Sequence, residues 1–357
     1  MPNVLDIRRR IRSVINTRQI TKAMKTVSAA KLRRAQEAAL AARPYSQMLT
    51  NVLKSLVSRA DVYDPETGEP RHPLLAERPE KTILAIIVTG DKGLAGAFNT
   101  NILKVVTKFI ELRSDKNIDI ECIGRKGRDF MRRRFPTAPR RSAPDNGERE
   151  AGPGPRAGRV QIVGEHVGVL GKVEFNFASG LAGTVIDRYV RGEIDGVYIL
   201  YNEFKSVIAQ RLIAEHILPI KEIGVVDVRM AEEADEEERK RRLEAAKGAG
   251  VSVRPADTRA VDEAAEKFAT AQVDYIYEQA PDELFRAILP KYIGIEIFHA
   301  LLESVAAEHA ARMTAMDSAT NNASDMIDSL TLAMNRARQA KITKEIIEIV
   351  SGAAAQG

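Results

Sequence analysis

The sequence predicts an α/β domain of Rossmann-like type joined to a long antiparallel α-helical coiled coil that the N- and C-terminal helices form together. Three observations support this fold class. Both ends of the 357-residue chain carry apolar residues at helical spacing, the middle alternates strand-like and helix-like segments, and aromatic residues make up only 5% of the chain. Few aromatic residues, together with ends rich in Ala, Leu, Glu and Arg, favour long helices over a thick β core.

The first long helix is expected over residues 1–58. Val4, Ile7, Ile11 and Val14 fall at 3-4-3 spacing, and three later residues continue an apolar face: Ile20, Met24 and Val27. Residues 3–58 contain no glycine, and their one proline, Pro44, is expected to bend or break the helix. Unbroken, the helix would be about 80 Å long at 1.5 Å per residue.

The central α/β domain is expected over residues 80–227. Strand-like segments occur at Thr82–Thr89, Ile118–Gly124 and Val197–Glu203, and helical patterns at Asn99–Arg113 and Leu181–Arg191. This alternation favours βαβ units and a parallel sheet. Within the domain, residues 142–159 are rich in Gly and Pro and predict a flexible loop.

Residues 228–270 are predicted to form an inserted, highly charged helical excursion, since an acidic block runs directly into a basic one there. Residues 271–357 complete the chain with a connecting segment and a second long helix, expected from about Lys291 to Val350. Apolar positions of this helix alternate by three and four residues, which is a heptad seam: Met316, Ala319, Ala323, Met326, Leu330, Ala333, Ala337 and Ala340. Because the central domain connects the two long helices, they are expected to pair antiparallel.

Composition excludes several classes of protein. The net charge of +5 is small for the length, and the one cysteine, Cys122, excludes a disulfide framework or a multi-cysteine zinc site. The five histidines lack metal-ligand spacing, and no catalytic motif is present, so neither a metal nor a cofactor is expected. The first residues lack the apolar core of a secretory signal, and no apolar run is long enough to span a bilayer.

One glycine-rich loop, Gly90–Gly96, follows the first strand and resembles a phosphate-binding loop. It fits neither the dinucleotide-binding pattern nor the P-loop pattern. A tight strand-to-helix turn that needs glycine is the favoured interpretation, although open α/β sheets do bind ligands at this edge.

The end of the second long helix carries the most informative motif. Arg338 and Gln339 fall off the heptad seam, and an apolar tip follows them, formed by Ile346, Ile347, Ile349 and Val350. A coiled coil alone does not require apolar residues at the free end of a helix. An exposed apolar tip indicates a sleeve on a partner protein.

Several motifs in the same order resemble the γ subunits of F-type ATP synthases, the central rotor shaft. The resemblance rests on Ile342–Ala355, on Thr17–Met24 with the preceding Ile7–Ile11, on Glu308–Ala323, and on Val88–Asn99. It spans both ends of the chain and most of the middle. It implies a non-catalytic rotor, present as one copy per complex, that threads an α3β3 hexamer, contacts an ε subunit and stands on a membrane c-ring.

The resemblance also implies roles for individual residues. Met24, Arg338, Gln339 and Thr343 match positions that contact the catalytic β subunits, and the apolar tip would lie in the hexamer sleeve. Tyr275 and Glu278 match the foot segment on the c-ring. The implied location is the cytoplasmic face of a bacterial plasma membrane, with the chain bound peripherally.

Two other classes remain open on the residues alone. A nucleotide-binding enzyme would need a working phosphate loop, which Gly90–Gly96 does not supply. A basic coiled-coil protein that binds nucleic acid, or an adaptor, would fit the basic ends but not the apolar tip. The segment 228–270 falls near a redox-regulatory insert of chloroplast relatives, but it lacks the required cysteine pair; a steric or charge-based brake on rotation is a hypothesis there.

Overall fold

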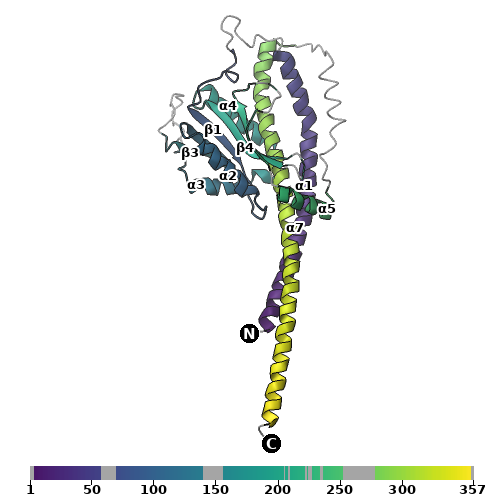
Figure 1. Cartoon of the computed structure of the whole chain (residues 1–357). Coiled ribbons are helices and arrows are strands. Elements are labelled where there is room, and N and C mark those ends of the chain that lie inside the picture. Colours follow the sequence, from purple (N-terminus) through teal and green to yellow (C-terminus); the bar gives the residue numbers. More distant parts are fainter. Residues whose placement is uncertain are drawn as a thin grey trace, which may run out of the picture.

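The computed structural model describes residues 4–57, 70–139, 156–204, 206–207, 210–221, 223, 227–233, 236–251 and 278–354. An α/β domain lies beside one half of a pair of long helices, and the other half of the pair projects from it as a narrow stem (Figure 1). The chain therefore combines the two architectures that its sequence predicts.

The two long helices are α1, Val4–Val57, and α7, Pro281–Ala354. Helix α1 continues through Pro44, so the expected break at this residue is absent. Helix α7 begins ten residues before Lys291 and contains Pro290. Helix α1 packs against α7, and the part of α7 around Pro290 packs against the domain. These lateral contacts hold the chain helical where each proline removes one backbone hydrogen bond.

A six-stranded mixed sheet forms the centre of the domain, in the order β3-β2-β1-β4-β5-β6. The pairs β3-β2, β2-β1 and β1-β4 are parallel, whereas β4-β5 and β5-β6 are antiparallel. The strands are β1 Thr82–Val88, β2 Asn117–Ile123, β3 Val160–His166, β4 Gly196–Phe204, β5 Gln210–Leu218 and β6 Asp227–Glu233.

Three of these strands, β3, β5 and β6, are absent from the sequence prediction. Strand β6 occupies the start of the segment expected to be a helical excursion, and it extends the sheet antiparallel to β5. A helix, α5, Glu236–Ala249, follows it, as the charge pattern predicts. The sheet, expected to be parallel, is therefore mixed, because β5 pairs antiparallel with β4 and β6 pairs antiparallel with β5.

Helices cover both faces of the sheet. One face packs against α2, Phe98–Glu111, and α3, Arg125–Arg132; the other packs against α4, Phe175–Val190, and α7. Strand β1 is buried on both faces, which explains its continuous apolar sequence.

The hydrophobic core extends from the sheet into the long helices. Helix α7 contributes apolar residues at every fourth position to the cluster between the sheet and α4: Phe285, Leu289, Ile293 and Ile297. Leu53 and Leu56 of α1 belong to the same cluster. The domain and one half of the helix pair therefore share one core, and only the other half is a free-standing stem.

Candidate interaction surface on the long helices

The stem is an antiparallel pair whose register two polar contacts define. The Thr21 and Thr320 hydroxyls lie 2.8 Å apart, and the Lys25 ammonium lies 2.5 Å from the Asp317 carboxylate. From the first contact to the second, the residue number rises by four on α1, from Thr21 to Lys25, and falls by three on α7, from Thr320 to Asp317. The two helices therefore run antiparallel, as the sequence predicts.

On α1, the residues turned toward the partner helix follow a heptad repeat from Val4 to Ala39. Apolar members begin and end the seam, while polar residues occupy its centre. Ile20 and Val27 lie outside it, with 60% and 55% of their surface exposed, so they do not continue the buried apolar face that begins with Val4. Met24, next to them along the helix, is half-buried. These side chains form an apolar strip beside the seam.

On α7, the seam departs by one residue from the predicted heptad. Met316, Ala323 and Leu330 lie in it, but Met326 is 54% exposed. Its place is taken by the half-buried neighbour Ile327. The same shift replaces Ala319 by Thr320, whose hydroxyl reaches Thr21, and replaces the exposed Ala333 by Met334.

Helix α1 ends before α7 does. From the Thr21–Thr320 contact, Val4 lies opposite a residue near Ala337, and beyond that level α7 continues alone (Figure 1). Every residue from Lys341 to Val350 is exposed. Arg338, Gln339 and Thr343 are exposed where α7 loses its companion. Met24 lies on the order of 30 Å away along the stem, at 1.5 Å per residue. The four predicted contact residues therefore lie at two separate levels of the stem, with Met24 at one level and the other three at the other.

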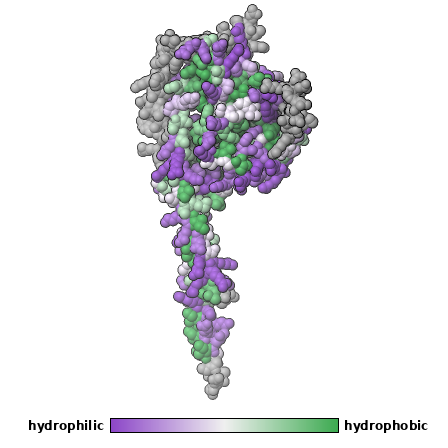
Figure 2. Space-filling model, turned by 180° about the vertical axis from the view of Figure 1, so that it is seen from behind, coloured by the Kyte–Doolittle hydropathy of each residue, from purple (hydrophilic) through white to green (hydrophobic). Residues whose placement is uncertain are grey.

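The free end of α7 is amphipathic. Ile346, Ile347, Ile349 and Val350 expose 54%, 58%, 71% and 61% of their surface. Figure 2 shows apolar side chains gathered near the end of the stem. Two ion pairs one turn apart, Lys341–Glu345 and Lys344–Glu348, lie on the polar side at 3.6 and 3.5 Å. Within the described part of the chain, no hydrophobic cluster includes the residues of this apolar tip.

Of the two predicted foot residues, the structure describes only Glu278, at the opposite end of α7 from the apolar tip. Glu278 is exposed and lies three residues before the start of α7. Tyr275 lies outside the described residues. The only part of the predicted foot that the structure places is thus at the far end of α7 from the apolar tip.

The glycine-rich loop after β1 is occupied by internal contacts. The Gly90 amide donates to Asn99 Oδ1 at 2.8 Å, and Asp91 accepts from the amides of Arg125 and Gly168 at 2.9 and 3.0 Å. Arg312 of α7 donates to the Gly93 carbonyl at 3.4 Å. The loop thus ties the edge of the sheet to α7, which supports the turn interpretation over a phosphate site.

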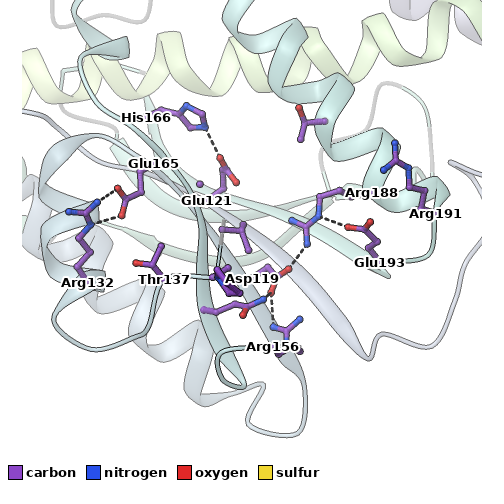
Figure 3. A pocket seen from close by; sticks show the side chains of 16 residues that line it. Asp119, Glu121, Arg132, Thr137, Arg156, Glu165, His166, Arg188, Arg191 and Glu193 are labelled. Atoms are coloured by element: carbon purple, nitrogen blue, oxygen red, sulfur yellow. Dashed lines mark hydrogen bonds and ion pairs between the residues drawn. The ribbon is translucent and has the colours of Figure 1, made fainter. Parts of the chain in front are cut away.

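A pocket of about 720 Å³ lies on the domain, between β2, β3 and α4 (Figure 3). Its charges pair with one another. Asp119, almost fully buried, accepts from Arg188 and, at 2.6 Å, from Arg156; the Glu121 and His166 side chains meet at 2.5 Å. Among the residues described, no group of three or more His, Cys, Asp or Glu side chains is placed to hold a metal ion.

Within the described part of the chain, no helix is both long enough and apolar enough to cross a membrane.

Comparison with known proteins gives one consistent result. The ATP synthase family model matches residues 3–356. The ATP synthase gamma chain of Solibacter usitatus is 45% identical over 355 residues, and the Pelotomaculum thermopropionicum gamma chain is 40% identical; each alignment covers 99% of both chains.

Solved structures show the same fold. A chain of the Euglena gracilis mitochondrial ATP synthase, in rotational state 3, superposes with a TM-score of 0.54 at 16% identity, covering 99% of this chain and 94% of that one. A chain of the central stalk and c-ring of the Tetrahymena thermophila enzyme gives 0.50 at 22% identity, covering 84% and 99%. Matched from end to end by bacterial gamma chains, this chain belongs to the ATP synthase γ subunit family.

Proposed function

We propose that the chain is the central rotor shaft of an F-type ATP synthase, which couples ion flow through a membrane c-ring to ATP synthesis or hydrolysis on the β subunits. One observation carries the proposal. A two-helix stem leaves a compact domain and ends in a single exposed helix with an apolar tip, which suits insertion into a ring of partner subunits. The family membership supports this role.

The shape of the stem explains how a chain without nucleotide chemistry of its own can direct that chemistry elsewhere. Helix α1 ends beside α7, so the stem presents a pair of helices at one level and a single helix at the next. A ring of three identical β subunits would meet a different surface of this stem at each site. Each rotation angle then favours one conformation at each site, which is a population shift produced by contact.

Contacts with the β subunits are assigned to two levels of the stem. At the level where α7 continues alone, Arg338, Gln339 and Thr343 offer a cation and two polar groups to solvent. Higher on the stem, Met24 belongs to the apolar strip with Ile20 and Val27. Basic and polar groups suit an acidic partner surface, since charge complementarity fixes register and discourages wrong contacts.

The two ends of the molecule are assigned to different partners. The apolar tip, Ile346 to Val350, would lie in the sleeve of the α3β3 hexamer, where burial removes its large exposed apolar surface from water. The foot segment, to which Tyr275 and Glu278 are assigned, would stand on the c-ring, and Glu278 lies at the opposite end. The domain would contact the ε subunit. The polarity of α7 supports this assignment, because the tip and Glu278 lie at opposite ends of it.

The chain would be a peripheral membrane component, held at the membrane through the c-ring. The proposed site is the cytoplasmic face of a bacterial plasma membrane, because this chain is similar to gamma chains of bacteria such as Solibacter usitatus over 99% of their length.

The first test is a pull-down of the tagged chain from its native membranes, with mass spectrometry and an ATPase assay of the eluate. Recovery of α, β and ε subunits with ATPase activity is expected. A chain recovered alone, or with nucleic acid in place of those subunits, would overturn the proposal and favour the basic coiled-coil alternative.

The assigned contact is tested in the recovered complex with Arg338→Ala. We expect ion pumping per ATP hydrolysed to fall several-fold, since the stem loses a charged contact where α7 stands alone. Arg191→Ala is the matched control, because Arg191 is an exposed arginine at the end of α4, in the domain and not in the stem. Equal coupling in both variants would remove Arg338 from the contact surface.

A further inference from the structure

A cluster of three carboxyl groups lies in the junction between the sheet and α7. Glu215, on β5, is only 6% exposed. Glu296 and Glu303, two turns apart on α7, act on it electrostatically, and Glu296 acts more strongly. We call Glu215, Glu296 and Glu303 the junction cluster. Glu215 lies between Ile213 and Ile217 on one face of β5, and both isoleucines belong to the hydrophobic cluster that includes Ile297 of α7.

Few donors reach the junction cluster. The Tyr201 hydroxyl, on β4, donates to Glu215 Oε2 at 3.0 Å, and His299 Nδ1 lies 3.5 Å from Glu303 Oε1. Glu303 Oε2 is buried without a hydrogen-bond partner in the part of the chain that the structure describes. On α7, the Tyr292 hydroxyl also hydrogen-bonds Glu296 and opposes the rise of its pKa. The other charged groups near the cluster are Glu203 on β4 and Arg211 on β5, which pair with each other.

The surroundings favour the neutral form of the cluster. Burial, reinforced by the Glu296 carboxylate, raises the pKa of Glu215 to about 8, although the Tyr201 hydroxyl opposes the shift. Burial also raises the pKa of Glu296, against the opposing effect of His299. Like charges inside a protein, far from water, cannot all ionise without cost. At neutral pH, a proton on Glu215 relieves both the repulsion and the loss of hydration.

We propose that the junction cluster is a proton-dependent latch between the α/β domain and α7: protonated Glu215 lets the sheet and the helix pack, and loss of that proton loosens the junction. The latch would hold the folded chain together whether or not the chain rotates in a complex. Its test therefore uses the full chain alone, and its failure would leave the proposed function intact.

The direction of the pH effect follows from where the proton binds. Between about pH 4.5 and 8 the folded chain holds a proton on Glu215 that the unfolded chain has released. The contribution of Glu215 is therefore most favourable below pH 4.5 and declines as the pH rises to about 8. Above that value the decline stops, because both states are ionised.

The decisive variant is Glu215→Gln, which resembles the protonated side chain and cannot ionise. We expect its thermal midpoint to equal that of the wild type at pH 5 and to exceed it by about 5 °C at pH 8.5. Glu283→Gln, an exposed glutamate on the first turns of α7, is the matched control and should follow the wild type at each pH. A Glu215→Gln midpoint that stays level with or below the wild type at pH 8.5 would overturn the latch.

Two further measurements keep the test decisive if Glu215→Gln fails to fold. Glu296→Gln removes the main like charge beside Glu215, so it should also raise the midpoint at pH 8.5 relative to the wild type. Infrared spectroscopy of the wild type should show a protonated carboxyl band that disappears with a midpoint near pH 8 and is weaker in Glu296→Gln at that pH. A wild-type chain with no such band at pH 6 would contradict the proposal.

Discussion

At the scale of single residues, the stem contains a charged pair where a coiled coil usually has apolar residues. Lys25 and Asp317 meet at 2.5 Å, and their side chains are only 16% and 17% exposed. A largely buried ion pair is stable only when both partners are present, because each carboxylate or ammonium withdrawn from water needs its counter-charge. The pair therefore fixes the register of α1 on α7 more than it adds to stability.

Removing one partner of this pair should be costly. Lys25→Met keeps the length of the side chain but leaves Asp317 without its counter-charge, and we expect a loss of roughly 3 kcal/mol in the free energy of unfolding. Lys25→Met combined with Asp317→Leu should recover most of this loss. Urea titration of the full chain measures both values.

The control for this prediction is Arg9→Ala, which removes the exposed Arg9–Asp6 pair at the free end of α1. An exposed pair of this kind should change the free energy of unfolding by less than about 1 kcal/mol. If Lys25→Met were as mild as Arg9→Ala, the Lys25–Asp317 pair would be solvated and would not set the register.

At the scale of elements, the sequence predicts helices better than strands. Strand β1 can be predicted from the sequence because both of its faces are buried, so nearly all of its residues are apolar. Strand β5 cannot be predicted in this way, because it buries Glu215 and His216 among its apolar residues and shows no apolar-polar alternation. Local patterns cannot show that a charged residue is buried, since the partners that allow it lie on other elements.

The coiled-coil seam shows the same limit. Its existence and direction are predictable, but its exact positions are not, because polar residues occupy the centre of the α1 seam. Ile20 and Val27 are apolar yet exposed, whereas Thr21 and Ser28, one residue further on, are buried. The candidate contact surface follows from this difference, since apolar residues kept out of the seam are left for a partner. The exposed tip, in contrast, is predictable, because Ile346, Ile347, Ile349 and Val350 are apolar residues that the heptad seam does not require.

Helix α5 is a separate element docked on the long helices where the stem leaves the domain (Figure 1). Ala246 is fully buried in a cluster that includes Leu32 of α1 and Met313 of α7. Ala246→Glu places a charge in this cluster, and we expect it to release α5 while the sheet stays folded. Limited trypsin digestion should then cleave at Arg239–Arg242 several times faster.

The control for α5 is Glu244→Ala, an exposed position on the same helix that should leave the digestion rate unchanged. Loss of the circular-dichroism signal of the whole chain in Ala246→Glu would show instead that α5 is needed for the fold. Slow digestion in both variants would mean that α5 stays docked despite the buried charge.

At the scale of the whole molecule, stability and recognition are divided along α7. Residues near its start belong to the core of the domain, and residues in the middle pair with α1. Residues after about Ala337 have no partner helix in the described part of the chain. One continuous helix thus passes from a packed interior to full exposure. Helix α7 resists bending where it packs against α1 and the domain, so it connects the domain rigidly to the stem. Such a connection suits an element that transmits torque.

This division predicts that the apolar tip can be changed without loss of stability. Replacing Ile346, Ile347, Ile349 and Val350 by Gln removes apolar groups that are all more than half exposed, so the free energy of unfolding should change by less than about 0.5 kcal/mol. Self-association of the isolated chain, measured by sedimentation, should decrease, because the exposed apolar surface is smaller. Replacement of Leu289, Ile293 and Ile297 by Gln on the same helix is the contrasting control and should unfold the domain, since these residues are buried in its core. A tip variant that unfolds as readily would show that the tip packs against its own chain, and the division between a stabilising and a recognising part of α7 would be wrong.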